Sequence, residues 1–358
     1  MTRGINVTRL FFVVSGENPT LPYSEVKSIL SAEGYSYRVL GGLTQVLRVE
    51  ADVKCVEAVK FRSALARYCC LEIFSCEADP NIIMLNLANA DFDKFLEDGD
   101  SFVVRVERIR GSSPHVSCIA LERRIGEIIF ERMRERKVRV ELKNPNKTFL
   151  GFLTDNTFIF GLKLAELTRK ELIERNPSRR VFFHPAALTA KMARCMVNLA
   201  QARRNDLILD PFCGTGSILI EAGLIGCRVM GSDVKRYMVR GSTKNLNSLG
   251  IKPEHMAVAD ARFLPLATGS VDRIVTDPPY GTAATTLGLT VKDLIDRFLH
   301  SAEDVLKDDG IICLAAPKTL GVSEIGERHG FKHLESHYIY VHRRLTREIA
   351  VFKKPKRT

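Results

Sequence analysis

A glycine-rich turn between a predicted strand and a predicted helix constrains the fold of this 358-residue chain more than any other feature. The strand Leu207–Leu209 runs into Asp210-Pro211-Phe212-Cys213-Gly214-Thr215-Gly216, and an apolar helix follows directly. Glycine lets a ligand approach the backbone closely, and the helix N-terminus behind the turn offers free amides. From Val181 onward strands and helices alternate, which predicts a parallel, doubly wound α/β sheet.

The end of the chain departs from this alternation. Tyr338–His342 and Glu348–Phe352 flank a short basic segment and predict an antiparallel hairpin. A parallel sheet that finishes in such a hairpin resembles the class I methyltransferase fold rather than a dehydrogenase. The other predicted strands of this half are Val229–Gly231, Met256–Val258, Arg273–Thr276 and Gly310–Ala315.

Acidic residues end three successive predicted strands, where open α/β sheets bind ligands. Asp233 is placed to accept both hydroxyls of a ribose, and Asp260 to accept from an adenine amine. The turn lacks the third glycine of a dinucleotide site, and Asp210 suits a ligand with ammonium and sulfonium charges. We therefore predict S-adenosylmethionine as cofactor. The predicted contacts are Asp210, Cys213, Gly214, Thr215, Gly216, Asp233, Asp260 and Ala261.

A second motif, Asp277-Pro278-Pro279-Tyr280, follows the strand Arg273–Thr276. The exocyclic amine of a base is a poor nucleophile because its lone pair is delocalised into the ring. Asp277 and the Pro278 carbonyl can each accept an N–H and direct the lone pair at a methyl group. The proline pair fixes that carbonyl, and Tyr280 offers a ring on which an extruded base can stack. We predict these four residues as the catalytic site.

The carboxylate of Asp277 favours guanine over adenine as the base. Guanine presents N1–H and N2–H side by side, and one carboxylate can accept both. Adenine presents an acceptor beside its amine, which an asparagine would match better. Adenine stays an alternative, because some adenine-methylating enzymes also carry aspartate at this position.

The first half contains two smaller α+β modules without a glycine-rich nucleotide loop. Its β-α-β-β-type opening predicts a ferredoxin-like domain. The next module resembles a THUMP domain, an RNA-binding unit of tRNA-modifying enzymes, in Val103–Arg108, Glu122–Gly126 and Val140–Asn146. The predicted domains are residues 1–61 (ferredoxin-like), 62–163 (THUMP), 164–180 (linker) and 181–358 (methyltransferase).

The formal net charge of +11 predicts a polyanionic partner. Arginines crowd the first half, although glutamates alternate with some of them and form a solvated helix face. The predicted RNA contacts are Arg105, Arg108, Arg110, Arg123, Arg124, Lys143 and Asn144.

Taken over nearly its whole length, the chain resembles the archaeal-type tRNA guanine-10 N2-methyltransferases. The resemblance adds Phe182-Phe183-His184-Pro185, Gly231-Ser232-Asp233 and His342-Arg343-Arg344-Leu345-Thr346-Arg347 to the motifs above. It implies tRNA as substrate, one or two methyl groups on N2 of guanine 10, and His184 as a cofactor-side contact. Family members often have glycine where this chain has Ala186, which puts a close approach at that position in doubt.

The resemblance also implies a protein partner for some relatives. In the expected sheet order the strand Met256–Val258 lies at an open edge, which a partner can extend. We expect a small zinc-binding activator protein to dock there, or else an edge protected by its own loops.

The composition indicates the cellular compartment of the protein. No apolar run reaches the roughly 20 residues that span a bilayer, and the N-terminus lacks the pattern of a signal peptide. The nine cysteines form no C-x-x-C pair and lie mostly in apolar contexts, which predicts neither a metal site nor disulfides. We expect a cytoplasmic protein.

Three other functions fit part of this pattern. A related enzyme with the same modules would methylate another tRNA guanine. A DNA adenine-N6 methyltransferase shares the Asp-Pro-Pro-Tyr motif but does not need the Lys143-Asn144-Pro145-Asn146 module. A non-catalytic RNA-binding scaffold would tolerate loss of Asp277 or of the cofactor acids, yet all are present.

Overall fold

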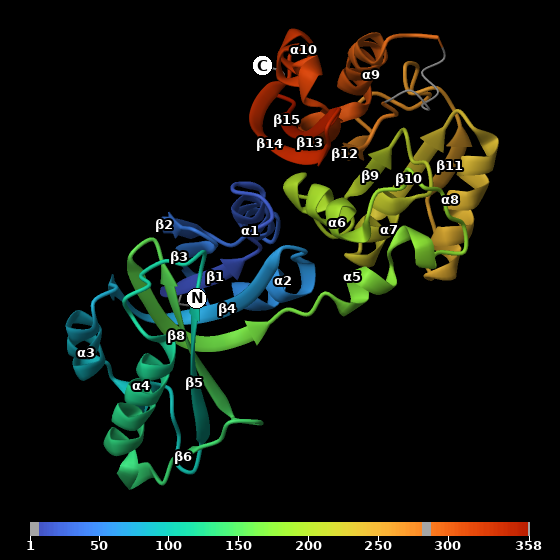
Figure 1. Cartoon of the computed structure of the whole chain (residues 1–358). Helices are drawn as coiled ribbons and strands as arrows, with labels where there is room; N and C mark the ends of the chain where they lie inside the picture. Colours follow the sequence, from blue (N-terminus) through green and yellow to red (C-terminus); the bar gives the residue numbers. More distant parts are fainter. Residues whose placement is uncertain (1–6, 281–287, 357–358) are drawn as a thin grey trace. The chain divides into compact units, whose positions relative to one another are not determined.

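The computed structural model describes residues 7–280 and 288–356 (Figure 1). Its internal contacts divide the chain into two compact units. The first comprises Met1–Tyr23, Tyr35–Phe61 and Ala66–Leu167, and the second comprises Ser24–Gly34, Arg62–Leu65 and Thr168–Thr358. Each unit is built on one sheet, and the two sheets differ in kind.

The first sheet has eight strands in the order β2-β3-β1-β4-β8-β7-β5-β6. Its first four strands, with α1 and α2, form the β-α-β-β-α-β arrangement expected of a ferredoxin-like module. The strands are β1 (Val7–Val14), β2 (Tyr37–Leu43), β3 (Val46–Asp52), β4 (Ala66–Glu77), β5 (Ser101–Arg108), β6 (Arg139–Val140), β7 (Lys147–Thr154) and β8 (Thr157–Glu166). The helices are α1 (Leu21–Ala32), α2 (Cys55–Arg62), α3 (Pro80–Asn89) and α4 (Cys118–Arg132), with 3-10 turns η1 (Phe92–Lys94) and η2 (Arg134–Arg136).

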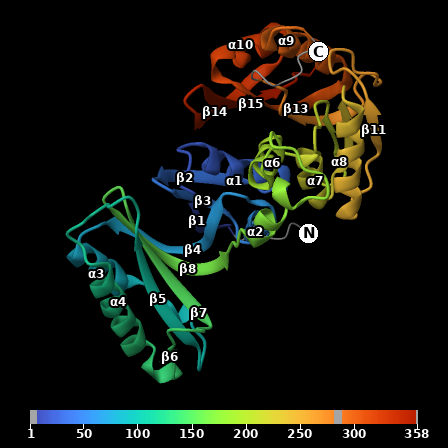
Figure 2. The ribbon, with the colours of Figure 1, turned by 45° about the vertical axis from the view of Figure 1, so that its right-hand side comes forward.

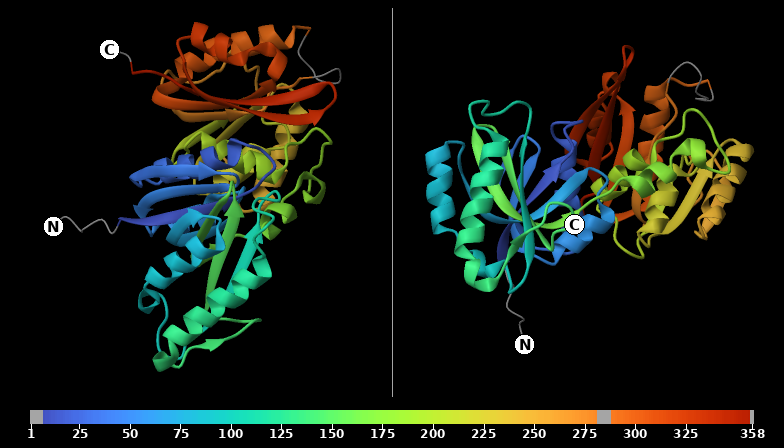
Figure 3. Two further views of the ribbon diagram at one scale, coloured as in Figure 1. Left: turned by 60° about the vertical axis from the view of Figure 1, so that its left-hand side comes forward. Right: turned by 60° about the horizontal axis from the view of Figure 1, so that its bottom comes forward.

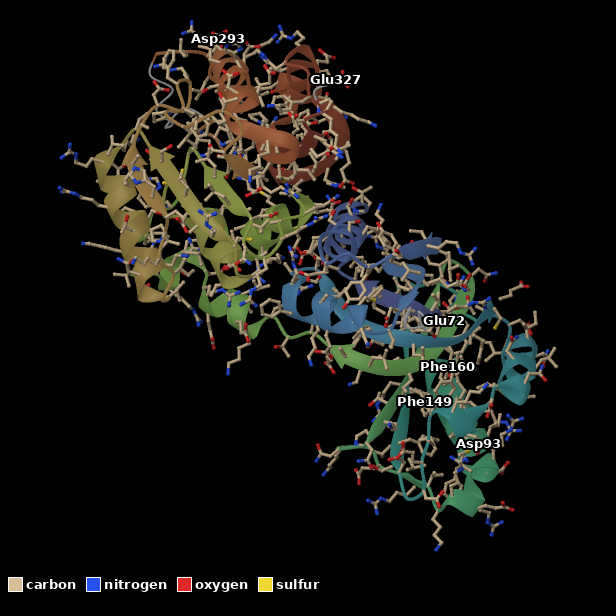
Figure 4. The ribbon with its side chains drawn as sticks, turned by 180° about the vertical axis from the view of Figure 1, so that it is seen from behind. Glu72, Asp93, Phe149, Phe160, Asp293 and Glu327 are labelled. Carbon is tan, nitrogen blue, oxygen red and sulfur yellow. The ribbon has the colours of Figure 1, made fainter. Side chains whose placement is uncertain are left out.

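Helix α4 covers the part of this sheet that contains β5, β7 and β8. It begins where Ser117 Oγ accepts a hydrogen bond from the amide of Ala120, and its apolar stripe is buried on the sheet. Phe149 of β7 and Phe160 of β8 stack with ring centroids 5.8 Å apart beneath it (Figure 4). This aromatic core belongs to the first unit alone.

The sheet is continuous across residue 61, because β1 pairs with β3 on one side and with β4 on the other. Strand β4 therefore completes the first module from beyond that position. The division of the first half at residue 61, and the linker expected at 164–180, remain predictions.

The second sheet has seven strands in the order β11-β10-β9-β12-β13-β15-β14 (Figure 1). The strands from β11 to β13 are parallel, and β15 and β14 close the sheet as an antiparallel hairpin (Figure 3). The strands are β9 (Leu207–Asp210), β10 (Arg228–Asp233), β11 (His255–Val258), β12 (Val271–Thr276), β13 (Leu306–Pro317), β14 (Lys332–His342) and β15 (Leu345–Lys353). The predicted class I methyltransferase architecture is confirmed.

Helices cover both faces of this sheet (Figure 2). On one face, α7 packs against α6 and α8, and on the other α9 packs against α10. The helices are α5 (Lys170–Glu174), α6 (Ala190–Leu199), α7 (Ser217–Leu224), α8 (Arg236–Ser248), α9 (Val291–Val305) and α10 (Val322–Arg328), with 3-10 turns η3 (Pro177–Arg179) and η4 (Lys318–Leu320). Two covered faces explain why the central strands are almost continuously apolar.

Two short segments from early in the sequence belong to the second unit. Glu25 is completely buried and accepts hydrogen bonds from Asn198 Nδ2 of α6 at 2.9 Å and from the amides of Ala64 and Leu65, each at 2.9 Å. Arg62 donates to Asn198 Oδ1 at 3.2 Å. These buried polar contacts join residues 24–34 and 62–65 to helix α6 of the second unit.

None of the helices in the described ranges, residues 7–280 and 288–356, combines the length and apolar character that crossing a membrane requires.

Candidate active site

A cavity of about 580 Å³ lies within the second unit. It collects residues from the carboxyl ends of parallel strands and from the terminal hairpin, as the sheet topology allows. The segments that contribute lining residues are His184–Ala187, Pro211–Thr215, Asp233–Lys235, Asp260–Ala261, Asp277–Tyr280 and Val341–Arg347, together with Met238 and Leu294. Both predicted motifs therefore open into one space.

The glycine-rich turn needs its glycines for two reasons. Gly214 has φ +48° and Gly216 has φ +83°, a region that residues with a Cβ rarely adopt. A Cβ on Gly216 would also lie 2.4 Å from Ser242 Oγ of α8. Gly214 and Thr215 line the cavity, whereas Gly216 and the buried Cys213 lie behind them.

Asp210 is placed differently from the other predicted cofactor acids. Its Oδ1 accepts from Thr276 Oγ1 at 2.7 Å and from the amide of Phe212 at 3.1 Å. The side chain is buried and is not part of the cavity lining. Burial raises its pKa to about 7. In this structure Asp210 joins β9 to β12, and its contact with the cofactor remains a prediction.

Asp233 and Asp260 both line the cavity, as predicted. Asp233 accepts from the amide of Gly214 at 3.1 Å and from the amide of Lys235 at 2.9 Å, while burial raises its pKa. Asp260 is paired with Arg262, whose Nε lies 2.9 Å from Oδ2, and this pairing lowers the pKa of Asp260. Both carboxylates retain lone pairs for a ligand's hydroxyl or amine groups.

His184 also lines the cavity, and its Nδ1 accepts from the amide of Ala186 at 3.2 Å. The ring is thus oriented by a short local turn. Ala187, which the motifs did not include, lines the cavity beside it.

The four predicted catalytic residues, Asp277, Pro278, Pro279 and Tyr280, all line the cavity. Tyr280 donates its hydroxyl proton to Asp277 Oδ1 at 2.7 Å. Arg347 of β15 donates from Nε to the Tyr280 hydroxyl, and its Nη2 lies 3.8 Å from Asp277 Oδ2. Burial raises the pKa of Asp277, and Arg347 and Tyr280 oppose that rise.

Sequence reasoning assigned no role to Arg347. It also missed Val341, His342 and Leu345, which line the same cavity. The basic hairpin segment belongs to the family resemblance, but nothing local in the sequence indicates that it returns to the Asp277 motif.

The polar and apolar side chains that line the cavity fit S-adenosylmethionine. Two carboxylates can accept from hydroxyl and amine groups, and Phe212, Val234 and Met238 offer apolar surface to a purine. A second set, Asp277 and Tyr280, lies in the same cavity and suits the amine and the face of a base. The cavity can thus hold a methyl donor and a methyl acceptor together.

The predicted RNA contacts of the first unit fall into three groups. Arg123, Arg124, Lys143 and Asn144 are exposed, the two arginines pairing with Glu127. Arg105 and Arg110 donate to the carbonyls of Leu142 and Gly16, each at 3.2 Å. Arg108 donates to the carbonyls of Ser112, Ser113 and Val116, so its visible role is to hold that loop.

Comparison with known proteins relates the chain to methyltransferases along its whole length. Residues 177–348 match the family model described as RMKL-like, methyltransferase domain. A tRNA (guanine(10)-N2)-dimethyltransferase of Methanothermobacter thermautotrophicus is 37% identical over 346 residues, which cover 96% of this chain and 99% of that protein. A protein of the same name from Methanocaldococcus jannaschii is 31% identical over 371 residues, with 96% and 99% covered.

Among solved structures, TrmN from Thermus thermophilus has a TM-score of 0.54 at 22% identity, covering 97% of this chain and 99% of that one. This similarity concerns the fold. The relatives above and the matching family model confirm that the protein is an enzyme that transfers methyl groups from S-adenosylmethionine. With 37% identity over almost its full length, the chain belongs to the family of the tRNA (guanine(10)-N2)-dimethyltransferases.

Proposed function

We propose that the protein methylates the exocyclic N2 of a guanine in tRNA, with guanine 10 as the position and one or two methyl groups as the product. One observation carries this proposal: Asp277 and Tyr280 open into the same cavity as Asp233 and Asp260. The printed function of the two relatives named above supports the base, the atom and the position.

At the base end, the chain's own residues prepare the amine. Asp277 accepts an N–H of the guanine amine, and the Pro278 carbonyl accepts the other, which frees the lone pair for attack. Tyr280 holds the base by its ring and is itself fixed by hydrogen bonds to Asp277 and Arg347. Such orientation and preorganised hydrogen bonding supply most of the catalysis. The proton that leaves nitrogen after methylation can pass to Asp277.

At the other end, Asp233 would hold the ribose hydroxyls of S-adenosylmethionine and Asp260 the adenine amine. When bound, this cofactor supplies an electrophilic methyl group on its sulfonium. His184, Gly214 and Thr215 line the same end of the cavity.

The first unit is proposed to bind the tRNA, as the THUMP resemblance implies. Arg123, Arg124 and Lys143 are exposed and can contact phosphates, which dominate the affinity and salt dependence of RNA binding. Replacing all three with glutamine should weaken tRNA binding and reduce its salt dependence, while cofactor affinity stays unchanged.

Nucleoside analysis tests the proposal directly. The full chain is incubated with unmodified tRNA transcript and S-adenosylmethionine, and the digested RNA is analysed by mass spectrometry. We expect N2-methylguanosine and N2,N2-dimethylguanosine, both lost when guanine 10 is changed to adenine. Methylation that persists in that transcript indicates another tRNA guanine, and N6-methyladenine in a DNA substrate indicates the alternative enzyme class.

An activator protein at the open sheet edge forms a second part of the proposal. Strand β11 lies at the end of the seven-stranded sheet, and in the part of the chain that the structure describes it pairs only with β10; Val258 is 50% exposed. A small zinc-binding protein could add a strand there. The other outcome is an enzyme that acts alone.

Val258→Lys should disrupt a complex with such a protein without changing tRNA binding. Ile173→Lys, at an exposed apolar position of α5, is the matched control and should leave the complex intact. If the purified enzyme is fully active and co-purifies with no partner, this part of the proposal fails.

We also propose a cytoplasmic location, where tRNA is modified. All nine cysteines are free thiols, and seven of them are buried, which fits a reducing compartment.

A further inference from the structure

Arg347 has a fixed position in the wall of the active-site cavity. It lies in β15, between β13 and β14, and its backbone is paired with Pro317 on one side and Ile339 on the other. Its side chain is 19% exposed and lines the cavity. A side chain that projects from the interior of a sheet is positioned more precisely than one on a loop.

The contacts of Arg347 leave part of its guanidinium available. Nε donates to the Tyr280 hydroxyl, and the distance of 3.8 Å from Nη2 to Asp277 Oδ2 is too long for a hydrogen bond. Within the described residues, 7–280 and 288–356, the Arg347 side chain makes only this one hydrogen bond, from Nε. The terminal nitrogens therefore present donors beside an acceptor in the same cavity.

We propose that Arg347 recognises the target base directly, by donating to O6 of guanine while Asp277 accepts from N1–H and N2–H. Along its Watson–Crick edge guanine presents two donors and then an acceptor. Asp277 and Arg347 present the complementary order, and their charges make both contacts stronger than neutral hydrogen bonds. The inference rests on the proposed function, which it extends from the methylated atom to the rest of the base edge.

The same pose excludes adenine. Adenine would direct the lone pair of N1 at the Asp277 carboxylate and its amine at the Arg347 guanidinium. Both contacts become repulsive, and no amine lies at the position of N2. A site built to pair with polar groups rejects a base that lacks them strongly, because its own buried groups are left unpaired.

Support of Asp277 and Tyr280 is a second role of Arg347, distinct from contact with the base. Arg347 also lowers the pKa of Asp277 and holds Tyr280, so its loss would reduce activity even if it never contacted the base. A purely supporting role lowers the rate on every substrate by the same factor. Direct recognition lowers the rate by a further factor where the base carries O6.

The test is therefore a cycle of enzyme and substrate changes. Single-turnover rates are measured with tRNA that carries guanosine, 6-thioguanosine or 2-aminopurine ribonucleoside at the target position. The thio base weakens the acceptor and keeps both N–H donors as long as N1–H, which is more acidic than in guanine, stays protonated. The base 2-aminopurine lacks O6 and also lacks N1–H, a second loss that is the same for every enzyme variant. Assays at pH 7.5 retain N1–H on the thio base and lie well above the ordinary pKa of an aspartate.

For each enzyme we take the ratio of the rate on guanosine to the rate on the analogue. This ratio should be at least about tenfold larger for the wild type than for Arg347→Met, as expected for the loss of one charge-assisted hydrogen bond. Arg347→Lys, which keeps a donor, should lie between the two. Arg344→Met, at an exposed position of the same hairpin, should discriminate as the wild type does. Unchanged affinity for S-adenosylmethionine verifies that the variants are folded.

Equal discrimination by the wild type and Arg347→Met overturns the inference and leaves Arg347 a supporting residue. A wild type that makes no N2-methylguanosine in any tRNA overturns the proposed function instead. The two failures are therefore distinguishable.

Discussion

The two ends of the active-site cavity balance their carboxylates in different ways. At the cofactor end, the partners of Asp233 and Asp260 are mostly close in sequence: the amide of Lys235 and the side chain of Arg262, each two residues away. At the base end, Asp277 also has a local partner, the hydroxyl of Tyr280, but in addition it faces Arg347, which is contributed by the last strand of the chain. The cofactor end is assembled mostly by local contacts, whereas the base end also needs the closing of the sheet.

Binding the cofactor and binding the base place different requirements on the protein. A cofactor that many enzymes share can be held by short loops after successive strands, each of which carries its own acid. A base must be held with its amine in line with a methyl group, which requires groups fixed from several sides. The terminal hairpin provides the side that the Asp277 motif lacks.

Asp277→Ala should reduce the methylation rate strongly and leave cofactor binding nearly unchanged. We expect the single-turnover methylation rate to fall at least about 100-fold, because a preorganised hydrogen-bond acceptor is removed from the reacting amine. Cofactor affinity measured by calorimetry should change less than about twofold, since the partner of Asp277 is the base. Asp277→Asn keeps the shape and is the control for packing. A residual rate within a few-fold of wild type would contradict the catalytic role.

Asp233→Ala should show the opposite pattern. We expect cofactor binding to weaken by about 1.5–3 kcal/mol, because a carboxylate that accepts two ribose hydroxyls is lost. Saturating cofactor should largely restore the methylation rate. Asp233→Asn keeps an oxygen for only one of the two amides, because Gly214 donates to Oδ2 and Lys235 to Oδ1, and it therefore shows how far the loop itself tolerates the loss of an acceptor. Wild-type affinity in the alanine variant would show that the ribose lies elsewhere.

Asp210 is a buried acid outside the cavity lining, in contrast to Asp233 and Asp277. Its pKa of about 7 lies above the ordinary value of 3.8, so the folded protein binds this proton more tightly than the unfolded chain does. Stability is therefore lost as pH rises from about 4 to about 7. Relative to Asp210→Asn, the wild type should lose a few degrees of Tm between pH 5 and pH 8. A Tm difference that is the same at both pH values would show that Asp210 does not titrate in this range.

The smallest effect is expected for Arg262→Ala. The pair of Arg262 and Asp260 lies near the surface, where ion pairs contribute about 0–1 kcal/mol. Cofactor affinity should change less than about fivefold, and the pKa of Asp260 should rise towards its ordinary value because its partner is lost. Arg273→Ala removes an ion pair with Asp206 outside the cavity lining and is the control, which should leave cofactor affinity unchanged. A loss of cofactor binding as large as that of Asp233→Ala would make Arg262 part of the site.

The order of the catalytic sheet could be predicted because its strands are short, apolar and separated by helices. Predicted and observed strands agree within two residues at Leu207–Asp210 and His255–Val258, and the exposed edge of the sheet was placed correctly. In the first unit, the β-α-β-β-type opening predicted above leaves out β4, and the sequence predicted no range for β7. In β7 the last six residues are buried without alternation, so the period-two pattern that marks a half-exposed strand is absent.

The sequence by itself determined the chemistry that depends on neighbouring residues: the glycine turn, the acids at three strand ends and the Asp277 motif. Each of these is a short run in which backbone geometry and side-chain type act together. Only the tertiary structure decided that Asp210 lies behind the cavity, that Glu25 and Arg62 belong to the catalytic unit, and that Arg347 faces Asp277. Those contacts join residues 66 to 173 positions apart, and their existence depends on which strands and helices pack together rather than on any local pattern.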